Sequence, residues 1–471
     1  MKAKSKWLAI FLVLGLILAA CGGDGGDDET DTTESETTDT TEAETTDTTE
    51  AETTDTTEGG DMAEIATDVG VDLEAGTINV GMLSDLTGQF SSLVQVIVTG
   101  HEVYWENVNA NGGINGLQVE LATVDTGYDV PTHVQRYEEL KDEVVAFGHS
   151  TGSPHTVAIA EQLQTDGILA IPLTWYSGWS APPFDSNLLH HGVNYCLEAM
   201  NIMGYLSDQM GDSISTVAIA SQPGDYGLDG VEGARLAAEA LGLEVVYDGA
   251  GAINPLPEGE ATLTEVANGI VASGADLVYV VTGPTAYSSI FGQALAQGFE
   301  AVWSGGGPSY NPAFIAPDSP IKDAIAASTY WSSYYSLWGM DTPGVQEATQ
   351  LLMDSGRVDQ PISAYFEGFV EAQMMHAALE AAYAAGDMTQ GGVLAAAKSL
   401  ENVSFNGLAP DETFVGEPSD QVQRLSATIW QPDPEALASG ASAGESVLET
   451  DYVHPITEAY EFTEACYAFE G

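Results

Sequence analysis

A serine stands at the centre of G-H-S-T-G, residues Gly148–Gly152, which fits the G-x-S-x-G pattern of a nucleophilic serine between a strand and a helix. Ser150 would attack a carbonyl only with the help of a histidine and an acid. His454, with a carboxylate before it, is the only late histidine that fits the order acid then histidine. A serine hydrolase that uses Ser150 is therefore one hypothesis.

The same segment allows a second kind of chemistry. Ser150, Thr151, Gly152 and Ser153 follow a predicted strand at 144–147 and precede a helical segment. Hydroxyls and free backbone N–H groups at the start of a helix bind anions or carbonyl oxygens. Helix capping by these hydroxyls is the structural alternative. We favour ligand contact, with Ser153 as the strongest candidate.

Metal and cofactor motifs are missing from the sequence. The chain contains neither C-x-x-C nor H-E-x-x-H, and Gly305–Gly307 lacks the Lys and Ser/Thr of a phosphate loop. The pair His190-His191 is interpreted as a surface feature. We expect no metal and no cofactor.

The first 20 residues are typical of a signal peptide. Three lysines within the first six residues precede an apolar stretch from Trp7 to Ala20, which is too short for an ordinary membrane-spanning helix. The ending L-A-A-C resembles the lipobox of bacterial lipoproteins. That resemblance implies cleavage before Cys21 and a lipid anchor on its sulfur. An ordinary signal peptide with an incidental cysteine is the alternative.

Residues 21–61 form an acidic tether rich in Thr, Glu and Asp. The unit D-T-T-E-A-E-T-T begins at Asp39 and again at Asp47, with a partial copy from Asp55. A segment this polar has no apolar surface to bury, so we expect it to stay disordered as a spacer. Beyond it, only Cys196 and Cys466 remain. In an exported protein they could form a disulfide or stay as free thiols, and the sequence leaves both open.

The charge balance excludes one class of partner. The formal net charge is −61, and most of the acidic excess lies after Asp61. A basic face for nucleic acid or anionic lipid is therefore excluded.

Strands and helices alternate from Thr77 onward, which predicts an α/β fold with parallel sheets. The predicted strands are 78–83, 119–124, 144–147, 168–171, 216–220, 243–247, 277–281 and 427–430. The predicted helices include 93–109, 231–241, 263–272 and 365–385. The stretch 436–450 gives no clear prediction.

Three segments of this region resemble one family of transport proteins. The runs Ile78–Phe90 (I-N-V-G-M-L-S-D-L-T-G-Q-F), Asn109–Gly116 (N-A-N-G-G-I-N-G) and Val124–Pro131 (V-D-T-G-Y-D-V-P) are similar to the solute-binding proteins of ABC importers. The subgroup contains the leucine/isoleucine/valine-binding proteins and their amide- and urea-binding relatives. Asp225–Gly227 (D-Y-G) is a further mark, and the resemblance covers about 77–430.

The resemblance implies two Rossmann-like lobes joined by a three-crossing hinge, with ligand bound between them. Lobe one would comprise 77–195 plus 329–425, and lobe two 196–328 plus 426–471 with the C-terminal tail. The implied partners are a small-molecule ligand and an ABC permease in the same membrane, and the implied function involves no catalysis. A ligand-sensing receptor of the same fold is the alternative.

The resemblance also implies ligand contacts. In lobe one the segment with Thr151 and Ser153 would hold the polar head of the ligand. The other implied contacts are Phe90, Thr174, Trp175, Tyr176, Tyr226 and Thr282. For each, simple packing is the alternative. The cluster Tyr330, Trp331, Tyr334, Tyr335 and Trp338 is interpreted as core and lobe interface.

One departure from the family concerns charge. Amino-acid binders of this type carry a carboxylate after the strand near Val302, where this chain has Gly307. A buried ammonium without a counter-charge is costly. Either Asp225 or Asp85 supplies the charge, or the ligand carries no ammonium. Within the expected range of amino acid, amide, urea or related carboxylate, this disfavours a leucine-type ligand and favours amides, carboxylates or aromatic compounds.

Overall fold

The computed structural model describes residues 65–181, 187–254, 259–416, 421–440 and 442–468. They belong to one compact unit, Met62–Gly471. The predicted signal peptide, Cys21 and the tether lie outside the described residues. Within the described part of the chain, no helix is both long and apolar enough to cross a lipid bilayer.

The first lobe is built on a sheet of four parallel strands in the order β4-β3-β5-β6. A short strand, β2, pairs antiparallel with the start of β3, and β1 pairs with β12 beside it. The bounds are β1 (Ala66–Thr67), β2 (Val71–Asp72), β3 (Thr77–Ser84), β4 (Gln118–Asp125), β5 (Ala146–Thr151), β6 (Ala170–Leu173) and β12 (Asp387–Met388).

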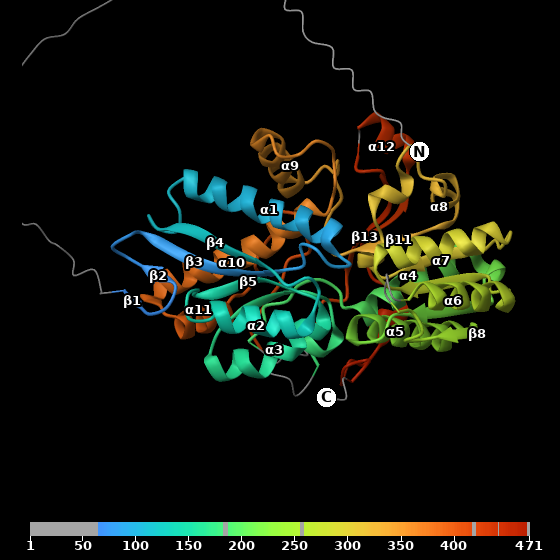
Figure 1. The fold of residues 1–471 in the computed structure, drawn as a ribbon, viewed down its shortest axis with the longest axis horizontal. Helices are drawn as coiled ribbons and strands as arrows, with labels where there is room; N and C mark the ends of the chain where they lie inside the picture. The colour runs from blue at the N-terminus through green and yellow to red at the C-terminus, as the bar shows by residue number, and fades with distance from the viewer. Residues whose placement is uncertain (1–64, 182–186, 255–258, 417–420, 441, 469–471) are drawn as a thin grey trace, which may run out of the picture. The chain divides into compact units, whose positions relative to one another are not determined.

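Helices cover both faces of this sheet because its strands bury apolar side chains on both sides. One face packs on α2 and α3, and the other packs on α1 and α10 (Figure 1). The bounds are α1 (Ser91–Ala110), α2 (Val130–Leu140), α3 (Ser153–Asp166), α9 (Pro343–Ser355), α10 (Tyr365–Ala385) and α11 (Gln390–Ala397).

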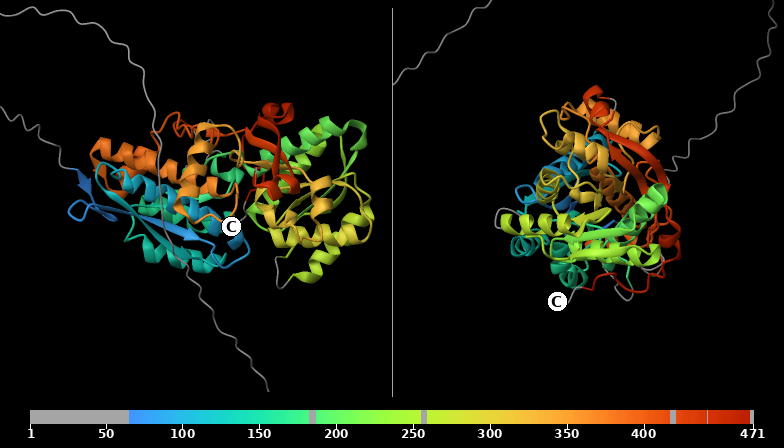
Figure 2. Two further views of the ribbon diagram at one scale, coloured as in Figure 1. Left: turned by 90° about the horizontal axis from the view of Figure 1, so that it is seen from above. Right: turned by 90° about the vertical axis from the view of Figure 1, so that its right-hand side faces the viewer.

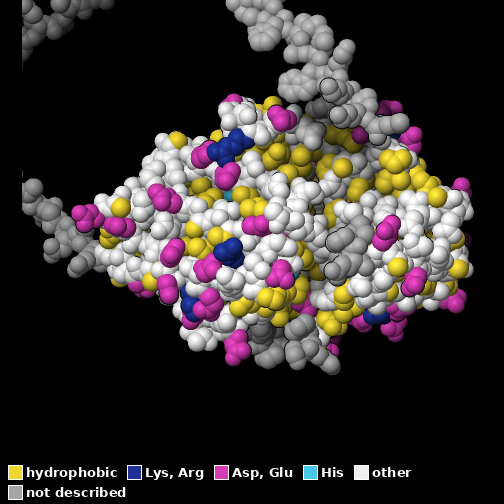
Figure 3. Space-filling view, in the orientation of Figure 1, with side chains coloured by type: hydrophobic (Ala, Val, Ile, Leu, Met, Phe, Trp, Pro, Cys, Tyr) yellow, Lys and Arg dark blue, Asp and Glu magenta, His cyan; other side chains and the backbone are white. Residues whose placement is uncertain are grey.

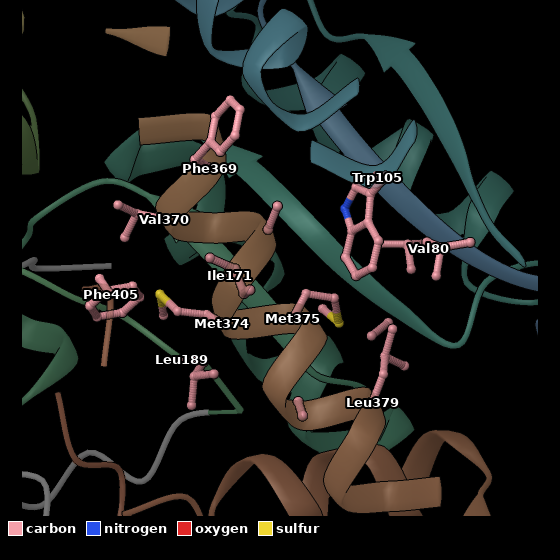
Figure 4. Close-up of a cluster of buried hydrophobic side chains, with 14 of the residues drawn as sticks. Val80, Trp105, Ile171, Leu189, Phe369, Val370, Met374, Met375, Leu379 and Phe405 are labelled. Carbon is pink, nitrogen blue, oxygen red and sulfur yellow. The ribbon is translucent and has the colours of Figure 1, made fainter. Parts of the chain in front are cut away.

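Helices α1 and α10 cross in close contact. A Cβ on Gly100 would lie 2.2 Å from the Tyr365 carbonyl oxygen, and one on Gly368 would lie 2.0 Å from that of Ile97. Only glycine permits this approach. Figure 4 shows α10 directing apolar side chains toward Trp105 and Val80, so α10 is the centre of the lobe-one core.

The second lobe has a four-stranded parallel sheet in the order β10-β9-β7-β8. Helices α4 and α5 pack on one face, and α6 and α7 on the other. The bounds are α4 (Tyr195–Met210), β7 (Thr216–Ser221), α5 (Asp225–Leu241), β8 (Glu244–Gly249), α6 (Glu260–Ser273), β9 (Leu277–Val281), α7 (Pro284–Ala296) and β10 (Val302–Gly305).

A third sheet, antiparallel in the order β11-β13-β14, lies between the lobes (Figures 1 and 2). The chain passes between the lobes three times: before α4, around β11 and at β13. The bounds are α8 (Lys322–Ser328), β11 (Trp331–Ser333), β13 (Ser426–Pro432), α12 (Pro434–Ser439), β14 (Glu445–Tyr452) and α13 (Pro455–Ala459). The expected α/β fold with two lobes and a three-crossing hinge is confirmed.

Cys196, in α4, forms a disulfide with Cys466 in the C-terminal tail. The bond closes a loop across 270 positions of the sequence. Of the two alternatives that the sequence left open, the structure contains the disulfide.

Two predicted strand positions are shifted. β5 runs through His149, Ser150 and Thr151, which were expected to follow the strand. β6 likewise begins two residues later than predicted. Polar residues extend β5 because their side chains are buried and find hydrogen-bond partners inside the lobe. The stretch 436–450, which gave no prediction, contains most of α12 and most of β14.

Candidate functional site

A cavity, called the outer cavity below, opens where the carboxyl ends of β5 and β6 face α5 of the second lobe. About 370 Å³ of space in and at the mouth of this cavity is free of atoms, including space open to solvent. This is where open parallel sheets bind ligands, because their strand ends and helix starts leave backbone groups unpaired. Its lining is Phe90, Leu93, Val94, Tyr128, Thr151, Gly152, Ser153, Leu173, Trp175, Tyr195, Tyr226 and Pro308.

A cluster of hydroxyls forms one wall of the outer cavity. Ser153 Oγ and Thr174 Oγ1 are within hydrogen-bond distance, and the Tyr195 hydroxyl hydrogen-bonds with both side chains. Burial raises the pKa of Tyr195, so its hydroxyl stays protonated at neutral pH. Ser153 begins α3, where backbone N–H groups have no intrahelical acceptor. This wall can donate hydrogen bonds to a carbonyl or carboxylate.

Gly152 makes this wall possible. Its φ of 97° lies in the region that favours glycine, and a Cβ there would be 2.6 Å from His155 Nδ1 and 2.8 Å from the Tyr128 ring. A side chain at this position would therefore displace the turn from β5 into α3.

Aromatic rings form the other walls. Phe90 lies 4.9 Å from Tyr128 and 5.8 Å from Tyr226, centroid to centroid, and Tyr195 lies 4.8 Å from Tyr226. The Tyr226 hydroxyl donates to the Thr282 carbonyl at 3.3 Å and is 3.1 Å from Ser309 Oγ. These bonds fix the ring of Tyr226, which α5 of lobe two contributes to the lining beside Tyr195.

A second cavity, the inner cavity, adjoins the first and shares Leu93, Trp175 and Pro308 with it. About 610 Å³ of space in and at the mouth of this cavity is free of atoms, including space open to solvent. Trp175 stacks on Tyr334 at a centroid distance of 3.7 Å where the two cavities meet. The other lining residues are Ile97, Gly307, Tyr310, Pro312, Ser332, Ser333, Tyr335, Leu337, Ile362, Ser363, Ala364, Glu367, Trp430 and Glu445.

Most of the predicted contacts meet at the outer cavity. Thr174 contributes through its bond to Ser153, whereas Tyr176 and Thr282 lie outside the lining of both cavities. The Tyr176 hydroxyl donates to the Tyr467 carbonyl at 2.7 Å, and Thr282 lies behind Tyr226. The predicted contacts that line the outer cavity are Phe90, Thr151, Ser153, Trp175 and Tyr226.

Sequence reasoning missed several lining residues. Tyr128 could have been found, because it follows β4 within the family-like run V-D-T-G-Y-D. Tyr195 gave no local signal, since it begins a helix after a long loop. Tyr334 and Tyr335, interpreted as core and interface, line the inner cavity.

The structure also places the two acids that could have served an ammonium. Asp85 accepts hydrogen bonds from the backbone N–H groups of Gly88 and Phe90 at 2.5 and 2.8 Å, so it holds the start of α1. Asp225 is buried outside both linings, and burial raises its pKa to about 6. No carboxylate is among the residues that line the outer cavity.

The carboxyl group that contacts Gly307 belongs to Glu198 of α4. The Gly307 N–H donates to Glu198 Oε1 at 2.9 Å, and the Tyr334 hydroxyl donates to Glu198 Oε2 at 2.8 Å. Burial raises the pKa of Glu198 to about 8. Glu198 therefore fixes the positions of Gly307 and Tyr334, which line the inner cavity.

The structure does not assemble the hydrolase site. Ser150 Oγ lies 2.9 Å from Thr156 Oγ1 and 3.2 Å from His133 Nε2, and Ser150 lines neither cavity. His454 instead lies beside α4, with its Nε2 3.3 Å from Asp208. The pairing of Ser150 with His454 that the hydrolase alternative requires is absent from the described structure, because both side chains have other partners.

Buried histidines and glutamates form a polar network inside lobe one. Glu371 Oε2 lies 2.8 Å from both His101 Nε2 and His149 Nδ1, and His149 Nε2 lies 2.7 Å from Thr151 Oγ1. By donor type, this trio could hold a metal ion, although these ring nitrogens already have hydrogen-bond partners. His191 is also buried, against Glu367, so its interpretation as a surface residue is wrong.

Comparisons with known proteins agree with this geometry. Residues 77–430 match the family model described as periplasmic binding protein. No curated protein sequence matches the chain significantly.

Solved structures show the same fold. A fatty acid ABC transporter substrate-binding protein from Thermomonospora curvata superposes with a TM-score of 0.75 at 25% identity, covering 84% of this chain and 97% of that one. A branched-chain amino acid ABC transporter protein from Thermus thermophilus with bound valine superposes with a TM-score of 0.67 at 18% identity. The match covers 81% of this chain and 98% of that one. A leucine-binding protein from Thermotoga maritima superposes with a TM-score of 0.64 at 15% identity, covering 80% of this chain and 99% of that one.

Proposed function

From the premise that this chain belongs to the periplasmic binding proteins that serve ABC transporters, we propose that it captures a small organic ligand in the outer cavity and delivers it to a permease. The ligand combines a polar head, which accepts hydrogen bonds, with an apolar body. The observation that carries this proposal is the hydroxyl cluster of Ser153, Thr174 and Tyr195 facing aromatic rings from both lobes.

The physical basis is a division of roles within the cavity. Hydroxyls at the ends of β5 and β6 orient the head, while Phe90, Trp175 and Tyr226 bury the body and exclude water. The absence of a carboxylate from the outer lining disfavours a leucine-type ligand. The fatty acid named for the Thermomonospora relative supports a ligand with a sizeable apolar part.

A ligand screen with a matched pair of variants tests the proposal. Leucine, acetamide, urea, benzoate and alkanoates are compared by thermal shift, because a ligand that binds the folded state raises its melting temperature. Ser153→Ala should weaken binding of the active compound about 3–10-fold, the usual worth of one hydrogen bond. Ser213→Ala, at an exposed position, should leave binding unchanged. Equal affinity of Ser153→Ala and wild type would contradict the assignment of the head site.

We also propose that the protein is exported and held by lipid on Cys21, with residues 22–61 as a spacer to the permease. The observations in support are the lipobox-like ending and the polar repeat. Cys21→Ser should release the protein from the membrane fraction without changing its affinity for ligand. Loss of affinity in the released protein would show that anchor and binding unit are not separate modules.

A further inference from the structure

The inner cavity differs from the outer one by containing two carboxyl groups. Glu367, from α10, and Glu445, at the start of β14, both line it, and they are 0% and 9% exposed. They come from chain segments far apart in sequence, which the fold brings to one cavity.

Glu367 has one oxygen engaged and one without a partner. Its Oε1 lies 2.7 Å from His191 Nε2, whereas its buried Oε2 has no hydrogen-bond partner within the described structure. A buried carboxylate oxygen left unpaired costs free energy. Because the Glu367 side chain also lines the cavity, this oxygen is the group that a donor on a ligand would satisfy.

One oxygen of the Glu445 carboxyl also has a hydrogen-bond partner. Its Oε2 accepts a hydrogen bond from Ser363 Oγ, which in turn accepts one from the Trp338 N–H at 2.8 Å. Ser363 lines the cavity as well. This fixes the position of the Glu445 carboxyl beside the same space.

The rest of the inner cavity favours a cation over an anion. Trp175, Tyr310, Tyr334, Tyr335 and Trp430 line it, and aromatic rings attract cations through their electron-rich faces. The chain as a whole has a formal net charge of −61. Acidic side chains are spread over the face in Figure 3, with few Lys or Arg among them. Such a surface attracts cationic solutes and repels anionic ones.

We propose that the inner cavity binds a primary ammonium carried at the far end of the ligand, with Glu367 and Glu445 as its counter-charges. This rests on the proposed function, in which the polar head of the same ligand lies at Ser153. The cavities adjoin, since Leu93, Trp175 and Pro308 line both, so an elongated ligand that occupies both must pass between them at these shared side chains. The ligand class is an ω-amino carboxylic acid or its amide. The counter-charge that the family places after β10 is here supplied from α10 and β14.

Paired probes on the full-length protein test this inference. Each ω-amino acid of about four to twelve carbons is compared by calorimetry with the alkanoate of the same length. At least one amino compound should bind about tenfold or more tightly than its alkanoate partner. This comparison needs no variant, so it holds even if a substitution impairs folding.

Two variants then assign the preference to the inner cavity. Glu367→Gln and Glu445→Gln should each reduce binding of the amino compound about tenfold and leave the alkanoate unaffected. Glu380→Gln, at an exposed position of α10, is the matched control and should change neither.

Alkanoates that bind as tightly as the amino compounds, or no binding by any amino compound, would overturn the inference. A preference for the amine that survives both glutamine variants would also overturn it. If alkanoates bind as tightly as the amino compounds and Ser153→Ala weakens both, the proposed function stands while this inference fails.

Discussion

The two lobes have similar sheets but different interiors. In lobe two, β9 is aliphatic apart from Tyr279, and β7 is aliphatic between Thr216 and Ser221 at its two ends. In lobe one, β5 ends in His149, Ser150 and Thr151, all buried and each hydrogen-bonded through its side chain.

The polar interior of lobe one reaches the wall of the outer cavity. Glu371 contacts His149, His149 contacts Thr151, and Thr151 Oγ1 accepts from the Asp85 N–H at 3.3 Å. Such a network fixes side chains in one arrangement, whereas aliphatic packing tolerates adjustment. We infer that lobe one supplies Ser153 and Thr174 in one fixed arrangement, while lobe two adds Tyr195 and Tyr226 to the same cavity.

The largest expected loss of stability is at Glu371, in the polar interior of lobe one. Glu371→Leu leaves His101 and His149 buried without their shared acceptor, and we expect it to lower the free energy of unfolding by about 3–5 kcal/mol. In lobe two, Ile219→Val removes one buried methyl and should cost about 1 kcal/mol. Denaturant unfolding measures both. Equal losses would show that the polar interior is no more demanding than the aliphatic one.

The disulfide gives the next largest expected effect, because it ties the tail to α4 of lobe two. Cys466→Ser should lower the free energy of unfolding by about 2–4 kcal/mol, since the unfolded chain regains the freedom of a long loop. Thiol titration of the denatured, unreduced protein checks the premise. Two titratable thiols in wild type would contradict the bond, and the variant would then unfold like wild type.

A smaller effect concerns pH, because buried acids occur in both lobes. Burial raises the pKa of Glu198 to about 8, and those of Asp229 and Glu412 to about 7. Between the ordinary carboxyl pKa and these values, the folded state binds more protons than the unfolded state. The stability that these three acids contribute is therefore fully present below about pH 4 and is lost as the pH rises to about 8.

We expect the melting temperature to fall by a few degrees between pH 5 and pH 8.5. Glu198→Gln, which cannot ionise, should make this slope shallower. Thermal unfolding at a series of pH values measures the slope. A slope as steep in Glu198→Gln as in wild type would show that other acids account for the effect.

The sequence revealed the fold more fully than the site. Alternating apolar segments predicted the parallel strands, because strands covered on both faces are apolar throughout. β5 was cut short because a buried polar strand end carries no apolar signal, and its partner Glu371 lies 222 positions away.

The site was predicted only where a strand end or a family-like run marked it. Ser153, Trp175 and Tyr226 follow such marks and line the outer cavity. Tyr176 differs from its neighbour Trp175 because adjacent side chains in an extended segment point to opposite sides. Glu367 and Glu445 had no signal, since they meet only through the packing of α10 and β14 near the hinge.

The C-terminal tail has a mechanical consequence. The Tyr467 carbonyl accepts a hydrogen bond from the Tyr176 hydroxyl, and the Tyr467 N–H donates to Asp229 of α5 at 3.2 Å. The Cys466 N–H donates to Ser177 Oγ at 2.9 Å. The bonds to Tyr176 and Ser177 thus connect the tail to the loop after β6, while the disulfide and the bond to Asp229 connect it to lobe two. When the lobes part, we expect the weak bonds to break while the covalent one holds. The tail then moves with lobe two, and its bonds to the loop after β6 form again at the same positions when the lobes close.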